Sequence, residues 1–178
     1  MRTSPPLHFR SICTNAVQLM LASLVFMAGL AHADVYDDVE RLIRNGQYER
    51  ASELGNAHLK THPSDPQMRL LRSRILDAQG QTDEATAQLE SLTLEFPELP
   101  EPHNNLAVLY ARQGHVQQAI ASLNKAVEMR PDYTVALENL GDLHLSLALQ
   151  AYQRAAAAPG ATTAPTRKAS AIAPLLQR

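Results

Sequence analysis

Two histidines have the most recognisable metal-binding spacing in this sequence. His58 and His62 are four residues apart, so on a helix both imidazole rings would lie on one face and could share a metal ion. A zinc site needs three or four ligands, and only these two are visible. We therefore interpret His58 as a half-buried packing residue and His62 as a helix-terminus residue, where a cationic imidazole is favourable. The sequence predicts no metal site and no cofactor.

The side chains that perform catalysis occur without the spacing that catalysis requires. The sequence contains no G-x-S-x-G nucleophile motif, no glycine-rich phosphate loop and no H-E-x-x-H metal motif. We interpret His103, His115 and His144 as surface or packing residues. The formal net charge is −2, which indicates no basic surface for nucleic acid. We expect a protein that is neither an enzyme nor a nucleic-acid binder.

The elements that carry these residues follow a repeat of 34 residues. Glycine, alanine and proline each recur in one register through three copies. The positions are Gly46, Gly80 and Gly114; Ala51, Ala85 and Ala119; and Pro63, Pro97 and Pro131. A period of this length is typical of stacked repeats.

Each of the three residue types has a physical role in a pair of helices. Glycine supplies at low cost the positive φ at which the first helix ends. Alanine lets the second helix cross the first closely, where a larger side chain would separate the backbones. Proline has no N–H and clashes with the preceding turn, so it ends the second helix. The repeat therefore predicts a helix, a tight turn, a second helix and a stop.

The third copy of the repeat is the most regular. Small residues, leucine and tyrosine occupy its packing positions before the glycine and the proline: Leu106, Ala107, Tyr110, Gly114, Ala119, Leu123, Ala126 and Pro131. This pattern closely resembles the tetratricopeptide repeat, and the resemblance extends over about residues 34–158. It implies an all-α fold, a right-handed superhelical stack of helix-turn-helix repeats.

About 3.5 repeats are expected. They occupy residues 34–65, 66–99 and 100–133, with an incomplete unit at 134–158. Leu140 and Gly141 keep the register of the fourth unit, but no glycine follows to end its helix. A single glycine inside a helix costs only about 1 kcal/mol. We therefore predict one long helix in this unit, without a turn near Ala148, that caps the stack.

The last segment, residues 159–178, is rich in alanine, threonine and proline. This composition predicts a loose tail after Pro159. A short final helix from Arg167 is the alternative, and Pro174 would limit its length.

The first 33 residues have the features of a secretory signal peptide. Arg2 and Arg10 precede a mostly apolar run at residues 16–30. This run is shorter than the roughly 20 residues of a membrane span. Ala31 and Ala33 supply the small residues that a signal peptidase requires, so we predict cleavage after Ala33. The alternative is an uncleaved leader that anchors the chain in a membrane.

Cys13 is the only cysteine and lies within this leader. The mature chain would therefore have neither disulfides nor thiolate metal ligands. An exported chain without disulfides favours a bacterial periplasm, and no stable membrane anchor is expected once the leader is removed.

The resemblance also implies a binding surface. In this family the first helices of successive repeats line a concave face, where an extended peptide commonly binds. Carried over by register, this groove would include residues from every repeat: Tyr36, Glu40 and Arg44; Leu70, Arg74 and Asp77; Asn104, Asn105, Val108 and Arg112; and Glu138, Asn139 and Asp142. An asparagine amide can pair with a peptide backbone, and Arg74 and Arg112 could hold a carboxylate.

The sequence thus predicts a periplasmic adaptor that binds a protein or peptide of the cell envelope in this groove. Self-assembly into a homo-oligomer is the alternative function. It is suggested by four leucines that spread apolar groups around much of the last repeat helix: Leu143, Leu145, Leu147 and Leu149. A helix that is apolar all round is usually buried.

Overall fold

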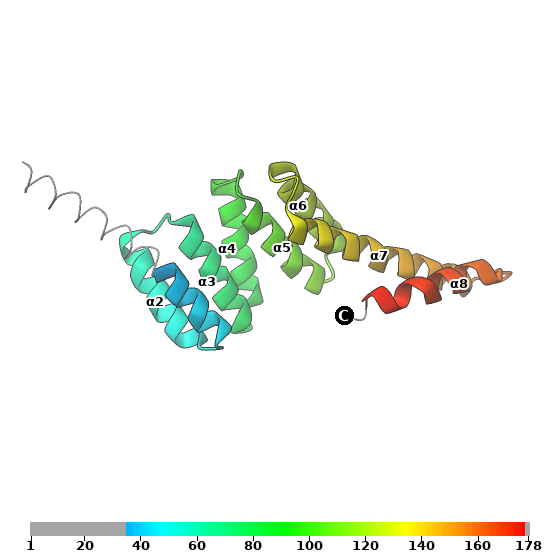
Figure 1. Ribbon diagram of the computed structural model, residues 1–178, viewed down its shortest axis with the longest axis horizontal. Helices are drawn as coiled ribbons and strands as arrows, with labels where there is room; N and C mark the ends of the chain where they lie inside the picture. The colour runs from blue at the N-terminus through cyan, green and yellow to red at the C-terminus, as the bar shows by residue number, and fades with distance from the viewer. Residues whose placement is uncertain (1–34, 177–178) are drawn as a thin grey trace, which may run out of the picture. The chain divides into compact units, whose positions relative to one another are not determined.

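The computed structural model describes residues 35–176, and every regular element within them is helical (Figure 1). In order, the elements are a helix that includes residues 35–44, α2 (Tyr48–Thr61), α3 (Pro66–Ala78), α4 (Thr82–Glu95), α5 (Pro100–Arg112), α6 (Val116–Met129), α7 (Thr134–Ala156), α8 (Thr163–Ile172) and a 3-10 turn (Ala173–Leu176). The predicted all-α class of helix-turn-helix repeats is confirmed.

Three glycines end the first helices of the pairs, as predicted. Gly46, Gly80 and Gly114 have φ angles of 69°, 80° and 79°, in the left-handed region that glycine enters at little cost. The Gly80 N–H donates to the carbonyl of Asp77 (3.0 Å), and the next N–H donates to the carbonyl of Leu76 (2.9 Å). The same two bonds recur at the other two glycines. They form a Schellman turn, which satisfies carbonyls that the helix end leaves open.

Prolines stop the second helices, also as predicted. Pro63, Pro97 and Pro131 each stand two residues after the end of α2, α4 or α6. The last bond at the end of α4 joins the Phe96 N–H to the Leu92 carbonyl (2.8 Å). Proline has no N–H with which to extend this series, so the helix ends there.

The described chain forms two compact units that divide between Ile75 and Leu76, inside α3. The core of the first unit is apolar: Val39, Leu42, Ala51, Met68, Leu71 and Ile75. In the second unit one apolar cluster joins α5, α6 and α7: Ala107, Ala119, Leu123, Ala126 and Ala136. The predicted crossing residues Ala51, Ala85 and Ala119 are all 0% exposed. The repeat pattern does not indicate the division into two units.

The fourth repeat unit forms a single helix of 23 residues, α7, which confirms the predicted long helix. It continues through Gly141 and Ala148 without a turn. Ala148 stands in the register position of the helix-ending glycines, so nothing at this position favours a positive φ.

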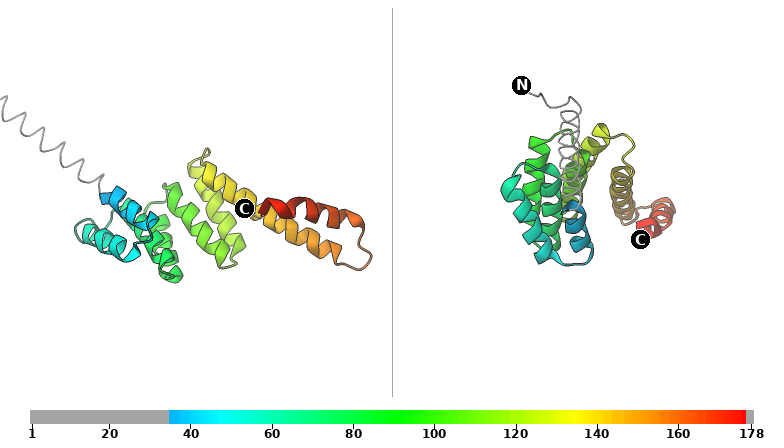
Figure 2. Two further views of the ribbon diagram at one scale, coloured as in Figure 1. Left: turned by 60° about the horizontal axis from the view of Figure 1, so that its bottom comes forward. Right: turned by 60° about the vertical axis from the view of Figure 1, so that its left-hand side comes forward.

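The prediction of a loose tail after Pro159 is wrong from Thr163 onward, and the alternative of a short final helix is confirmed, although α8 (Thr163–Ile172) begins before Arg167. Gly160, with a φ of 78°, turns the chain, and α8 then runs back beside the second half of α7 (Figure 2). Lys168 places its ammonium group 5.1 Å from the centre of the Tyr152 ring, a cation–π contact between the two helices. Alanines and Ile172 supply the partly buried face of α8. The chain itself thus supplies cover for α7 that the self-assembly hypothesis assigns to a second molecule.

The predicted leader and its cleavage after Ala33 lie outside the described residues. Between residues 35 and 176, no helix is both long enough and apolar enough to cross a bilayer.

Two glycine substitutions in the second unit should change stability in opposite directions. Gly114→Ala forces a β-carbon into the left-handed region and should lower the free energy of unfolding by about 1–2 kcal/mol. Gly141 lies inside α7, and a β-carbon there would meet no neighbouring atom within 4 Å. Gly141→Ala should therefore raise the free energy of unfolding by up to about 1 kcal/mol. Urea unfolding followed by circular dichroism measures both, and a shift of the same sign in the two variants would contradict this account.

Candidate functional site

The predicted groove residues of the second unit lie mainly on two adjacent helices, α5 and α7. Asn105, Val108 and Arg112 follow one face of α5 at helical spacing, and Val108 is 40% exposed although it is apolar. Glu138 and Asp142 are exposed on α7, with Asn139 half-buried between them in sequence. The structure therefore brings these residues of the third and fourth repeats onto neighbouring helices.

An amide ladder connects the two helices. The Asn139 Nδ2 donates to Asn104 Oδ1 (2.9 Å), and the Asn104 Nδ2 donates to Asn105 Oδ1 (3.3 Å). Asn104 is only 5% exposed. A buried amide must be hydrogen-bonded to offset its lost hydration, so this residue joins α5 to α7. The structure thus corrects the placement of Asn104 in the open groove, whereas Asn105 and Asn139 remain partly exposed at the two ends of the ladder.

Arg112 was predicted to hold a carboxylate of a ligand, but in the structure it is already occupied. Its guanidinium already pairs with the carboxylate of Asp77, the predicted groove residue on α3. Both side chains are partly exposed, and such an ion pair contributes about 0–1 kcal/mol. The pairing leaves this position close to electrically neutral.

The same correction applies to Arg74 in the first unit. Its guanidinium lies 3.7 Å from one oxygen of Glu40, and Arg44 lies 3.4 Å from the other. One carboxylate therefore faces two cations. Leu70 is half-buried, and its carbonyl accepts a hydrogen bond from the Ser73 hydroxyl (2.7 Å).

Tyr36 belongs to a polar cluster and does not stand alone in a groove. Its hydroxyl donates to Asp65 Oδ2 (2.5 Å), and the same oxygen lies 2.6 Å from His58 Nε2. The other oxygen of Asp65 accepts the backbone N–H groups of Gln67 (3.0 Å) and Met68 (3.2 Å). Asp65 thus caps the start of α3 and joins it to two other helices. The repeat pattern does not reveal this role, but an aspartate directly before Pro66 is a helix-start signal.

His58 is 8% exposed at its side chain, which confirms its interpretation as a packing residue. His62 is the residue that follows α2, as expected of a helix-terminus histidine. The two rings stack with centroids 4.6 Å apart. Across residues 35–176, no group of three histidine, cysteine, aspartate or glutamate side chains is arranged to hold a metal ion.

Burial and hydrogen bonding alter the acidity of this cluster. Burial, with the hydrogen bond to Asp65 and its negative charge, raises the pKa of Tyr36 to about 12. Burial alone would raise the pKa of Asp65, but the hydrogen bonds from Tyr36, the Met68 N–H and His58 together lower it below its usual value. In the second unit, burial and a bond to Glu90 (2.7 Å) similarly raise the pKa of Tyr110 to about 12.

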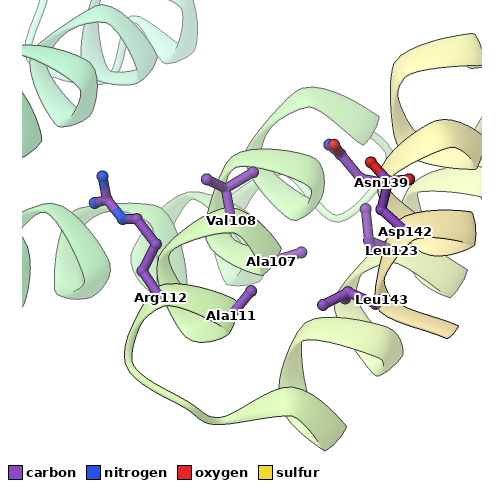
Figure 3. A pocket seen from close by; sticks show the side chains of 8 residues that line it. All are labelled: Ala107, Val108, Ala111, Arg112, Leu123, Asn139, Asp142 and Leu143. Atoms are coloured by element: carbon purple, nitrogen blue, oxygen red, sulfur yellow. The ribbon is translucent and has the colours of Figure 1, made fainter. Parts of the chain in front are cut away.

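An open hollow of about 240 Å³ lies between α5, α6 and α7. Its apolar lining comes from all three helices: Ala107, Val108, Ala111, Leu123 and Leu143. Asn139, Asp142 and Arg112 supply its polar groups. Figure 3 shows Asp142 beside Asn139 on α7, whereas the Arg112 side chain extends away from α7. The hollow can therefore take an apolar group with a polar neighbour.

Paired helices, Schellman turns and a 34-residue register define a helical-repeat protein. A family model of the tetratricopeptide repeat matches residues 42–109 and 77–140, which together make up more than half of the chain. The chain therefore belongs to the tetratricopeptide-repeat family.

Several known proteins resemble the chain. It is 29% identical over 143 residues to TPR repeat-containing protein YvcD of Bacillus subtilis (strain 168), and the match covers 79% of this chain and 28% of YvcD. TTC0263, a thermophilic TPR protein in Thermus thermophilus, has a TM-score of 0.61 at 20% identity, with 82% of each chain covered. YrrB, a TPR protein with an unusual peptide-binding site, has a TM-score of 0.53 at 25% identity, with 58% of this chain and 54% of YrrB covered. The chain thus spans little more than a quarter of YvcD.

Removal of the Asp65 carboxylate should destabilise the first unit. Asp65→Ala leaves Tyr36 and His58 without their shared acceptor and should cost about 2–3 kcal/mol at neutral pH. The pKa of Asp65 is lower in the folded chain than its usual value, so its contribution is present above about pH 4 and is lost as the pH falls through the folded value. Chemical unfolding at neutral and acidic pH measures the difference.

Asp37→Ala is the matched control, since Asp37 is exposed on the first described helix. It should change the free energy of unfolding by less than about 0.5 kcal/mol. Equal destabilisation by the two substitutions, or a loss from Asp65→Ala that does not shrink on acidification, would contradict the proposed role.

Proposed function

We propose that this chain is a non-catalytic protein-interaction scaffold that binds an extended peptide segment of another protein across α5 and α7. The observation that carries this proposal is the hollow at Val108, with a partly exposed amide at each end of the adjacent ladder. An apolar hollow can take a side chain of the peptide, while the amides of Asn105 and Asn139 can pair with its backbone. Helices hold both features in place before binding, which lowers the ordering cost of capture.

The similarity to YrrB supports this proposal, because YrrB is a TPR protein with an unusual peptide-binding site. The corrected ion pair of Arg112 also supports it. Arg112 holds a carboxylate of this chain, so the hollow of the second unit offers a ligand mainly apolar groups, the amide of Asn139 and the carboxylate of Asp142. This chemistry suits recognition and lacks an arranged nucleophile or base.

We further propose that the scaffold works in the cell envelope of a bacterium, in the periplasm. The features of the first 33 residues, and the absence of cysteine after Cys13, support this location. The partner would then be a protein or peptide of the envelope. A chain that keeps its leader as a membrane anchor would present the same helices from the membrane surface.

The chain recovered from bacterial cells should begin at Asp34. Ala33→Arg removes the small residue next to the predicted cleavage site, so it should leave an uncleaved, membrane-associated chain. Intact mass and N-terminal sequencing of periplasmic and membrane fractions measure the outcome. Recovery of the unsubstituted chain with its full leader would refute cleavage, and recovery from the cytoplasm would refute the location.

Val108→Gln should weaken capture of envelope proteins about tenfold, because burial of a valine side chain contributes about 1.5 kcal/mol. The chain, immobilised and exposed to an envelope extract, would be compared with the variant by quantitative mass spectrometry. Leu94→Gln is the control: Leu94 is an apolar residue on α4 that is 82% exposed and lies outside the hollow.

The control should retain the partners of the unsubstituted chain. Equal recovery of every partner by the Val108 variant would rule out the hollow as the binding surface. Losses that are equal in the two variants would show that exposed apolar surface in general, and not this hollow, holds the partner.

A further inference from the structure

One register position differs in its chemistry between the two units. In the first unit, Glu40 pairs with Arg74, which occupies the same position one repeat later. The next two repeats place Val108 and Asp142 at this position, and both line the hollow. Glu40 therefore has an arginine at the equivalent position of the neighbouring repeat, whereas Asp142 has Val108 at the equivalent position of its neighbouring repeat.

A second carboxylate reinforces this imbalance. Glu138 lies one helical turn before Asp142 on α7, and both side chains are exposed. Arg112 also lines the hollow, but it pairs with Asp77 and extends away from α7 (Figure 3). Within the described part of the chain, neither Glu138 nor Asp142 forms an ion pair. Asp142 therefore brings an uncompensated negative charge to the rim of the hollow, and Glu138 adds a second one turn away on α7.

We infer that this hollow binds a peptide segment in which an aliphatic side chain stands next to a lysine or an arginine. The inference deepens the proposed function and rests on it. The aliphatic group would lie against Val108, Leu123 and Leu143 in the hollow, while the cation would meet Asp142 at its rim and Glu138 one helical turn away. A volume of about 240 Å³ suits one side chain and is below the roughly 300–1,000 Å³ of typical small-molecule sites.

Charge also determines what this surface rejects. A peptide with acidic residues beside its aliphatic group would bring like charges together at α7, which disfavours binding. Arg112, the cation among the described residues that line the hollow, cannot compensate without giving up Asp77. The surface therefore selects for a basic partner through repulsion as well as attraction.

The test is a selection of phage-displayed random peptides on the purified chain as recovered from cells. Glu138→Gln/Asp142→Asn removes the carboxylate that lines the hollow and the one a turn before it on α7, with little change of shape. Glu98→Gln/Asp132→Asn is the matched control, because it removes the same two groups from exposed residues outside the helices. The unsubstituted chain and the control should enrich peptides with Lys or Arg next to Leu, Ile or Val, whereas the α7 variant should keep the aliphatic preference and lose the basic one.

A peptide from this selection, synthesised with a fluorescent label, gives the magnitude. The α7 variant should bind it about three- to tenfold more weakly than the control does, because two exposed charge contacts are lost. Binding by the unsubstituted chain should weaken as salt is raised, and binding by the α7 variant should be less sensitive to salt.

Three results would overturn the inference in distinguishable ways. Enrichment of acidic peptides, or a basic preference that survives in the α7 variant, would refute the charge selection while leaving peptide binding intact. No enrichment by the unsubstituted chain would refute peptide binding itself. Enrichment of sequences like residues 175–178 of this chain, together with concentration-dependent association in sedimentation, would assign the hollow to a second copy.

Discussion

The close crossing of paired helices at alanine is the contact on which the rest of this structure depends. Ala51, Ala85 and Ala119 are completely buried, because a methyl side chain lets two helix backbones approach closely. The sequence has no tryptophan and only 4% aromatic residues, so leucines such as Leu89 and Leu123 fill much of the core beside the crossings at Ala85 and Ala119. Burial of one such side chain contributes about 1.5–3 kcal/mol, which makes these contacts the main source of stability. A larger residue at the crossing would shift the second helix and with it the next pair.

A fixed crossing keeps the first helices in register, and the register determines which polar groups meet. Arg112 reaches Asp77 and Asn139 reaches Asn104, partners that are each 35 residues apart in sequence. Pairing of this kind removes most charges of the first helices from competition for a ligand. The charged groups that stay available to a ligand are therefore those without a partner in the neighbouring repeat. Asp142, which lies beside Val108, is one of them. The proposed binding surface thus lies where this pattern of pairing is interrupted.

The turns and stops were predictable because each depends on one residue type at a fixed offset. Gly80 must adopt a positive φ, and Ala148 in place of a glycine lets α7 continue. The partners of the polar side chains were not predictable, because helical spacing places Asn104 and Arg112 on a face without saying what lies opposite. A final helix was predicted only as the alternative to a loose tail, and from Arg167 rather than Thr163, since the alanine, threonine and proline content of the tail resembles that of loose segments. Its alanines nevertheless favour helix once Tyr152 and the leucines of α7 provide a surface to pack against.

The long α7 helix combines two roles that full repeats assign to separate helices. Its first half packs on α5 and α6 through Ala136, Leu140 and Leu143, and the exposed residues of that half include Glu138 and Asp142. Its second half extends past the start of α6 and is covered by α8. A glycine turn at residue 148 would instead have placed a second repeat helix directly against the first half. Because the helix continues, the end of the stack is closed by the α7–α8 pair, away from the hollow. The carboxylates of α7 can then face a partner, while the apolar side chains further along the same helix are covered within the chain.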